Sequence, residues 1–274
     1  MSEPMFRPRS AIEIVDAGFS IYRAHFATLA AIWIVLLGPF AIVGFLIGGP
    51  FGELISNASG FAMPLAVGAT VAVVSDAMHD RAVSLASAFG QTSGRSGTLL
   101  VVSFAQGILT FLGALLLIIP GVIVWCWTFA APMTVVVERV SGTSEAISRS
   151  KQLARGQFWH ILGSLAMSWL IVFVLVIAGA FGTGLIAGLI GLGERVQELL
   201  FQWVLILALP VTGATSGVLY FDLRVRNDGY DVERLAQTLD ESVAAPVNTS
   251  WGEGRRTSEV RSGVAVLVPV LRTP

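Results

Sequence analysis

Charge is scarce in this sequence. Only 13% of the 274 residues are Asp, Glu, Lys or Arg, whereas soluble domains carry about 25%. A soluble protein of this length would need far more charge to cover its surface. Long uncharged stretches run between His25 and Glu53, Glu53 and Asp76, Arg95 and Glu138, and Glu198 and Asp222. Each is at least as long as the roughly 20 residues that cross a bilayer core. The composition therefore predicts a polytopic membrane protein.

Cysteine and the common catalytic motifs are also missing or nearly so. Cys126 is the single cysteine, so no internal disulfide can form, and its apolar surroundings favour a core position. The three histidines, His25, His79 and His160, lie too far apart in the chain for metal-ligand spacing. No nucleophile elbow, phosphate-binding loop or zinc-protease motif is present. A net charge of −1 gives no basis for a nucleic-acid partner. We expect no catalytic site, metal or cofactor.

Long apolar segments make up most of the chain and predict an all-α fold, a membrane bundle of about six transmembrane helices. The candidate spans are Thr28–Gly48, Phe61–Ala77, Thr98–Ile119, Val122–Val137, Phe158–Phe181 and Leu199–Phe221. Pro120-Gly121 predicts a tight break between the third and fourth spans, and Pro210 predicts a kink in the sixth. The glycine-rich segment Gly182–Gly193 fits an extension of the fifth helix, a re-entrant piece or an outer loop.

Basic residues gather on alternate connections between the spans. They are Arg7, Arg9 and Arg23; Arg81 and Arg95; Arg139, Arg149, Lys151 and Arg155; and Arg224, Arg226 and Arg234. Only Arg195 falls on the opposite side. The positive-inside rule therefore predicts a multi-pass protein of the cell (inner) membrane with both termini in the cytoplasm.

Short amphipathic helices accompany the spans. Ser10 and Glu13 form a capping box at the start of one that reaches Arg23 and is expected in the membrane interface. Glu13, Arg23 and Phe26 match Glu145, Arg155 and Phe158 at one constant offset, and Arg95 holds the same place between them. This pattern fits either an interfacial helix plus helical hairpin repeated three times or chance similarity between amphipathic segments. We expect one membrane domain over residues 1–243 and a disordered cytoplasmic tail over residues 244–274.

Two groups of residues are candidate functional sites. One is a set of charged residues at the cytoplasmic ends of the spans, expected to include at least one ion pair: Glu138, Arg149, Asp222 and Arg224. The other consists of polar stripes on the third and fifth spans: Ser103, Gln106 and Thr110, and His160, Ser164 and Ser168. The stripes are interpreted as contacts between helices, with a substrate path as the alternative. His160 is interpreted as an interface residue hydrogen-bonded to backbone or to a lipid headgroup, with a proton relay as the alternative.

Several motifs resemble a known family of prokaryotic membrane proteins. They are Ile119-Pro-Gly, Trp127-x-Phe-Ala-x-Pro132, Glu138, Ala146-x-x-Arg149-Ser150-x-x-Leu153-x-x-Gly156-x-Phe158-Trp159, and Leu219-Tyr-Phe-Asp222-Leu-Arg224-Val-Arg226-x-x-Gly229-Tyr-Asp231. The family is named after the membrane domain of glycerophosphoryl diester phosphodiesterases, because some members carry that enzyme as a fused domain. The resemblance covers most of the chain from Arg7 to Ala236 and implies a six-span fold. It does not imply the enzyme activity, because no His precedes an Arg here and no soluble segment is long enough.

Three functions compete at this point. The first is a non-enzymatic scaffold or accessory module whose basic cytoplasmic surface contacts membrane lipids and other membrane or cytoplasmic proteins. The second is a transporter or channel for a lipid or small apolar molecule, which the polar stripes and Pro210 favour. The third is an intramembrane enzyme that acts on lipid headgroups. A cavity that reaches Gln106 and Ser164 would favour transport, and a solidly packed bundle would favour the scaffold.

Overall fold

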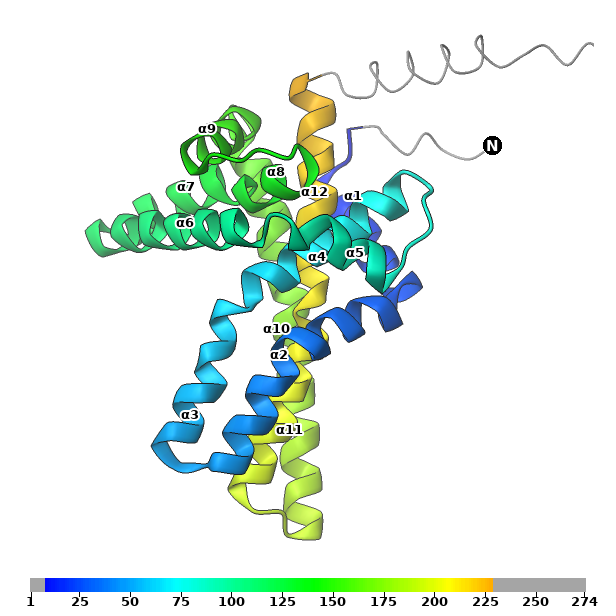
Figure 1. Cartoon of the computed structure of the whole chain (residues 1–274), viewed down its shortest axis with the longest axis vertical. Helices are drawn as coiled ribbons and strands as arrows, with labels where there is room; N and C mark the ends of the chain where they lie inside the picture. Colours follow the sequence, from blue (N-terminus) through cyan, green and yellow to red (C-terminus); the bar gives the residue numbers. More distant parts are fainter. Residues whose placement is uncertain (1–7, 229–274) are drawn as a thin grey trace, which may run out of the picture. The chain divides into compact units, whose positions relative to one another are not determined.

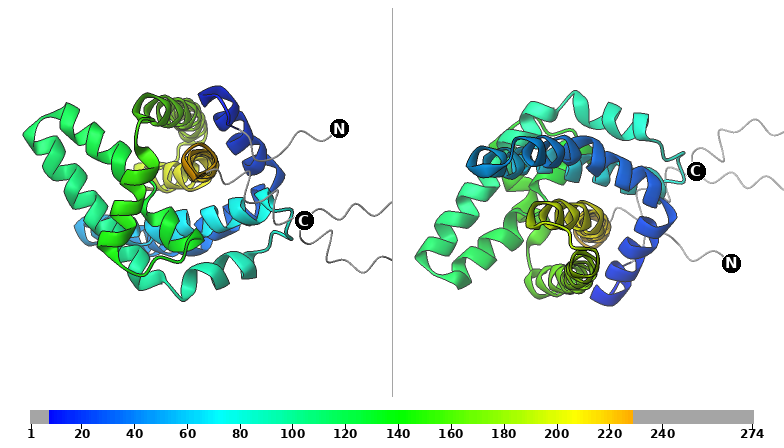
Figure 2. Two further views of the ribbon diagram at one scale, coloured as in Figure 1. Left: turned by 90° about the horizontal axis from the view of Figure 1, so that it is seen from above. Right: turned by 90° about the horizontal axis from the view of Figure 1, so that it is seen from below.

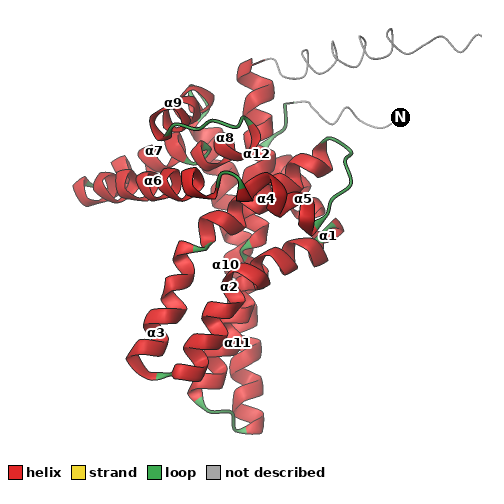
Figure 3. Ribbon diagram, viewed as in Figure 1, coloured by secondary structure: helices red, strands yellow, loops and turns green. Residues whose placement is uncertain are grey.

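The computed structural model describes residues 8–228, and every regular element in that range is helical (Figure 3). The elements are α1 (Ala11–Ala24), α2 (Phe26–Ile47), α3 (Gly49–Asn57), the 3-10 helix η1 (Ala58–Phe61), α4 (Met63–Met78), α5 (Leu85–Ser93), α6 (Ser96–Leu116), α7 (Ile118–Thr128), α8 (Ala131–Val137), α9 (Thr143–Ala154), α10 (Phe158–Ile190), α11 (Glu194–Ala208) and α12 (Pro210–Asp228). The expected tail over residues 244–274 and the domain boundary at 243 lie outside the described residues.

Six helical segments among the described residues are long and apolar enough to cross a membrane. α2, α6 and α10 form three of them, and the other three join α3 to α4, α7 to α8 and α11 to α12. The predicted all-α class with about six spans is confirmed. The glycine-rich segment after Phe181 continues α10 to Ile190, where Gly191 at φ +70° ends the helix.

Each of the three composite segments breaks and restarts near a proline. Pro64, Pro132 and Pro210 all lie in the first residues of the new helix, in α4, α8 and α12. A proline lacks the N–H group but needs no intrahelical donor there, so it starts a helix without loss. Pro210 was expected to kink a continuous span, and it instead begins a separate helix after Leu209.

The break between α6 and α7 falls earlier than predicted. Leu117 is extended (φ −168°, ψ 154°), and Pro120 lies inside the first turn of α7. The prediction at Pro120-Gly121 was wrong because a proline in a first turn continues the helix. Gly121 has a packing role, since a Cβ there would lie 2.8 Å from the Ala114 Cα atom of α6.

The helices do not all share one direction. In Figure 1, α10 and α11 run side by side as a long hairpin, with α2 next to α11, and the α6–α7 hairpin points sideways, away from them. Figure 2, which views the helices from the two ends, shows the same sideways extension. Most of α6 is exposed, and the exposed side chains at the tip of the α6–α7 hairpin are apolar, including Leu116 of α6 and Ile118 of α7.

The centre of the described unit is the contact between α4 and α12. Gly213 and Gly217 face Thr70 and Val74, and a Cβ at either glycine would lie only 3.0 to 3.1 Å from those side chains. Such small residues let two helix backbones approach closely. α12 is buried along most of its length, and its inner turns enter the same core cluster as α4 and α8.

The first amphipathic helix, α1, packs on this centre. The predicted capping box is present, with Ser10 N donating to Glu13 (2.7 Å) and Glu13 N donating to Ser10 (3.3 Å). Gly18 lies directly against the backbone of Thr215 in α12. The Tyr22 hydroxyl donates to the Leu207 carbonyl (2.8 Å) beside the α11–α12 break, and burial raises the pKa of this phenol. α1 is therefore an integral part of the bundle.

Candidate functional site

We call the end of the bundle that holds Asp222 the inner end, and the end that holds Gly48 and Gly191 the outer end. They are well separated, because the 33 residues of α10 span roughly 50 Å at 1.5 Å per residue. Polar and charged side chains gather at each.

At the inner end, Glu138 links α8, α9 and α12. It receives two hydrogen bonds from Arg149 of α9, from Nε at 2.8 Å and Nη2 at 3.2 Å, and one from the Tyr220 hydroxyl at 2.7 Å. Arg224 Nε lies 3.6 Å from the same carboxylate, and Arg149 also pairs with Asp228. The structure thus brings together Glu138, Arg149 and Arg224 from the predicted set, and it adds Tyr220 and Asp228.

This contact acts as a brace, by which we mean an ion pair that joins helices of the same chain. The fork of Arg149 meets both oxygens of Glu138, the geometry in which a guanidinium binds a carboxylate most strongly. Burial disfavours the charged form of Arg149, but its bonds to Glu138 and Asp228 outweigh that effect and hold its pKa above the usual value. The charges neutralise one another and fix α9 to the bundle.

The predicted ion pair is therefore made by Glu138, and Asp222, grouped with it from the sequence, belongs to a separate contact. Its carboxylate receives the backbone N–H of Arg9 (2.6 Å), His160 Nε2 (2.9 Å) and Arg226 Nε (2.7 Å). Arg226 also donates to the Arg9 carbonyl (2.6 Å). The interpretation of His160 as a residue bonded to backbone or lipid was therefore wrong, since its partner is a buried carboxylate. Nothing in the local sequence reveals partners 62 and 213 positions away.

Asp76, at the end of α4, forms a third contact of this kind, which the sequence reading missed. It is 3% exposed and binds Arg81 Nε (2.9 Å), the Ser87 hydroxyl (2.7 Å) and Gln91 Nε2 (2.9 Å). Ser87 and Gln91 belong to α5, so the carboxylate fixes α5 against the end of α4. In the sequence, this contact could have been recognised from Asp76 itself, which ends an apolar run and is followed five residues later by Arg81.

The three contacts follow one rule. Each carboxylate ends a broken span, and each holds the short segment that leads into a further hairpin: Asp76 holds α5, Glu138 holds α9, and Asp222 holds the residues before α1. The short helices also pack on the span that supplies the carboxylate, α5 on α4, α9 on α8 and α1 on α12. Three helical hairpins are thereby joined in a closed cycle, in agreement with the repeating unit considered from the sequence.

The polar stripes are not joined to these contacts, apart from His160. Ser164 and Ser168 are fully buried on α10, and the hydroxyls of Ser103 and Thr110 are buried on α6. None of the four hydroxyls has a hydrogen-bond partner within residues 8–228, so they are not hydrogen-bonded links between helices. Gln106 is half-buried.

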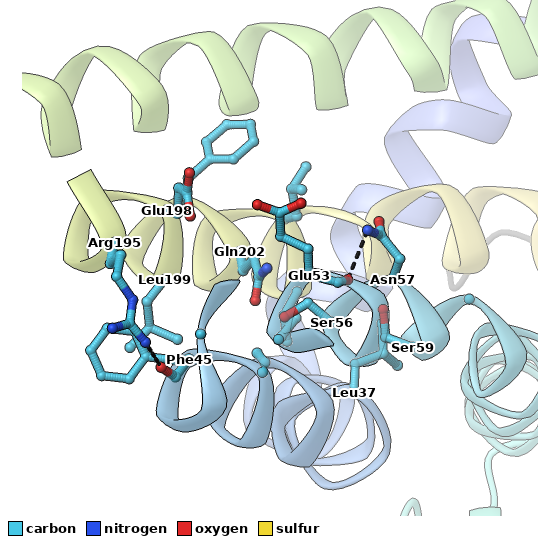
Figure 4. Close-up of a pocket in the computed structure, with 18 of the residues that line it drawn as sticks. Leu37, Phe45, Glu53, Ser56, Asn57, Ser59, Arg195, Glu198, Leu199 and Gln202 are labelled. Atoms are coloured by element: carbon cyan, nitrogen blue, oxygen red, sulfur yellow. Dashed lines mark hydrogen bonds between the residues drawn. The ribbon is translucent and has the colours of Figure 1, made fainter. Parts of the chain in front are cut away.

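At the outer end, a cavity of about 750 Å³ lies between the α2–α3 hairpin and α11 (Figure 4). Its mouth carries Glu53 of α3 and Glu194, Arg195 and Glu198 of α11. Its apolar lining comes from Leu37, Met63, Leu205, Ile206 and Leu209, and the uncharged polar side chains of Ser56, Asn57, Ser59 and Gln202 line it as well. A smaller cavity of about 360 Å³ between α10 and α11 shares Glu194 and Glu198. In the sequence, this site could have been recognised from Glu53, Glu194 and Glu198, because the connections at this end carry few other charges.

Arg195 is held at the edge of this mouth. Its guanidinium donates to the Phe45 carbonyl and lies 5.4 Å from the centroid of the Phe45 ring. Gly48 (φ +63°) leaves the space, since a Cβ there would overlap the guanidinium. No group of three or more His, Cys, Asp or Glu side chains in the described part of the chain is arranged to hold a metal ion.

Comparisons of the chain with family models, with curated proteins and with solved structures find no match.

Proposed function

We propose that this chain is a non-enzymatic scaffold or accessory module of the membrane, in the family of the glycerophosphoryl diester phosphodiesterase membrane domain. The observation that carries the proposal is that the carboxylates at the inner end are bound by donors of the same chain. Asp76, Glu138 and Asp222 each bind several donors of the same chain. Carboxylates engaged in this way build a rigid surface and leave little capacity for acid–base chemistry. The charged motif residues Glu138, Arg149, Asp222, Arg224 and Arg226 of the family resemblance fall within these contacts.

The inner end also presents basic side chains that could contact partners. Arg139, Lys151 and Arg155 are exposed on and around α9. With this end in the cytoplasm, such residues would attract anionic lipid headgroups or acidic protein surfaces. The partners proposed are membrane lipids and other membrane or cytoplasmic proteins.

The orientation itself is tested by cysteine labelling. Lys151→Cys lies at the inner end and Gln197→Cys at the outer end, and both side chains are exposed. In intact cells an impermeant thiol reagent should label Gln197→Cys and leave Lys151→Cys unlabelled. The native Cys126 is fully buried and supplies the unlabelled background. If only Lys151→Cys were labelled, the inner end would face the outside of the cell, and the proposed orientation would be wrong.

The scaffold is tested by charge reversal at the exposed residues. The double variant Lys151→Glu, Arg155→Glu should lose co-purifying lipids or proteins while its melting temperature stays near that of the parent. Lys151→Arg with Arg155→Lys is the matched control and should keep them. Unchanged co-purification in the reversed variant would argue against recruitment through this surface.

A transporter or channel for a lipid or small apolar molecule is the second candidate, favoured by the outer cavity and the three helix breaks. Discontinuous helices frame the substrate sites of many transporters. The cavity ends at Met63 and Leu209, however, and its lining includes neither Gln106 nor Ser164. Reconstituted protein that moves labelled lipid across a bilayer would favour this function over the scaffold.

A further inference from the structure

The outer cavity is built with two chemically different ends. Its mouth lies where the α2–α3 and α10–α11 connections meet, and the described charged residues that line it are three carboxylates and one arginine. Its inner part reaches the helix breaks at Met63 and Leu209, where Leu37 and Ile206 also line it; the uncharged polar side chains of Ser56, Asn57, Ser59 and Gln202 contribute to the rest of the lining. A ligand with a charged end and an apolar end suits this arrangement.

The volume matches a single small ligand. Pockets for small molecules typically measure about 300–1,000 Å³, and this cavity measures about 750 Å³. It is bounded by helices that approach closely beside it. Gly44 and Gly52 bring α2 and α3 into direct backbone contact, since a Cβ on Gly52 would lie 2.4 Å from the Gly44 carbonyl oxygen. That contact holds one wall of the cavity in place.

The charge at the mouth favours a cationic group. Glu53, Glu194 and Glu198 outnumber Arg195, whose guanidinium is already engaged by Phe45. The carboxylates do not form a metal-ligand group in the described residues. An organic ammonium suits separated carboxylates better than a divalent cation does, because a metal needs several oxygens at 2.0–2.6 Å.

We propose that this cavity binds an ammonium-bearing lipid, with the headgroup among Glu53, Glu194 and Glu198 and an acyl chain toward Met63 and Leu209. With the six segments spanning a bilayer, this end of the bundle would lie at a membrane boundary, where a lipid headgroup and the start of its chain occupy the same depth. This binding is independent of the scaffold role, which rests on the inner end.

The test uses the full-length protein in detergent and three probes. These are a single-chain phosphoethanolamine lipid, a phosphoglycerol lipid of the same chain length, and free ethanolamine. The phosphoethanolamine lipid should raise the melting temperature in a saturable manner, because a ligand that binds only the folded state stabilises it. The phosphoglycerol lipid should bind at least tenfold more weakly, and free ethanolamine should not saturate in the same range.

Two variants locate the site. The triple variant Glu53→Gln, Glu194→Gln, Glu198→Gln should weaken phosphoethanolamine-lipid binding at least tenfold, with Asp16→Asn, an exposed carboxylate on α1, as the control. Gln202→Trp, which fills the cavity without a change of charge, should abolish binding, whereas the exposed Phe181→Trp on α10 should not. Equal binding of the two lipids, or full binding by either cavity variant, would overturn the proposal. Neither result bears on the inner-end charge reversal that tests the scaffold.

Discussion

The two ends of the bundle use the same residue types in opposite ways. At the inner end, Asp76 and Asp222 are only 3% exposed and each is surrounded by donors. At the outer end, Glu53, Glu194 and Glu198 are exposed around a cavity. The difference follows from the supply of arginine, which is plentiful in the inner connections and limited to Arg195 in the outer ones. A carboxylate with partners in its own chain becomes a brace, and one without them remains available to a ligand.

The comparison predicts the largest loss of stability at Asp222. Asp222→Ala would leave His160, Arg226 and the Arg9 N–H without their acceptor. Removal of one member of a buried charged contact lowers the free energy of unfolding by about 3–5 kcal/mol. Unfolding in mixed micelles measures the change, with Asp16→Ala on the exposed face of α1 as the control. A loss equal to that of the control would remove the distinction between brace and surface residue.

The next effect is expected at Glu138 and Arg149. Glu138→Gln and Arg149→Gln should each lower the free energy of unfolding by about 1.5–3 kcal/mol, the range for hydrogen bonds to charged groups. The double variant should lose less than the sum of the two, with a coupling energy of about 0.5–3 kcal/mol. If the two losses were additive, the interaction between Glu138 and Arg149 would contribute nothing to the free energy of unfolding.

Asp76 should show a smaller effect than the other two inner carboxylates. Its arginine partner, Arg81, has a side chain that is 56% exposed, and exposed ion pairs contribute about 0–1 kcal/mol. Asp76→Asn keeps an oxygen that can accept from Ser87, so the expected loss is about 1 kcal/mol. Hydrogen exchange should show faster opening of α5 while α9 is unaffected. Equal acceleration in both helices would indicate a global effect.

The outer carboxylates should barely affect stability. Glu53→Gln and Glu198→Gln remove no intramolecular ion pair among the described residues, and such surface changes usually stay within about 0.5 kcal/mol. Relief of repulsion between the acidic groups would make a small gain the expected sign. The same unfolding measurement checks this, and a loss as large as that of Asp222→Ala would contradict the contrast between the two ends.

The helices were largely predictable from the sequence because a bilayer fixes their length and composition. Uncharged stretches of bilayer length located all six segments. The ends were harder to predict where composition is ambiguous. Gly182 to Ile190 is helical because glycine is well tolerated in membrane helices, and Pro120 continues a helix that the dipeptide Pro120-Gly121 appeared to end.

The contacts were predictable only where partners are close in the chain. Glu138 and Arg149 are 11 positions apart on consecutive elements, so their meeting follows from local order. His160 and Arg9 reach Asp222 from 62 and 213 positions away, and several other inner arginines satisfied the same pattern. α11 packs on α2, so the outer cavity depends on the separation of α3 from α11, which hydrophobic pattern alone does not encode.

The bond between Arg9 and Asp222 sets an order of events during synthesis. The bonds of Asp76 and the bonds between Glu138 and Arg149 join residues at most 15 positions apart, so each can form soon after its helices leave the ribosome, whereas Tyr220 reaches Glu138 from 82 positions away. Arg9 must wait for 213 further residues. Throughout elongation the N-terminal segment therefore lacks its final anchor, and a chain cut before α12 cannot supply one. Contacts between residues so far apart form slowly relative to local contacts. The N-terminal segment before α1 is therefore fixed only when α12 has packed.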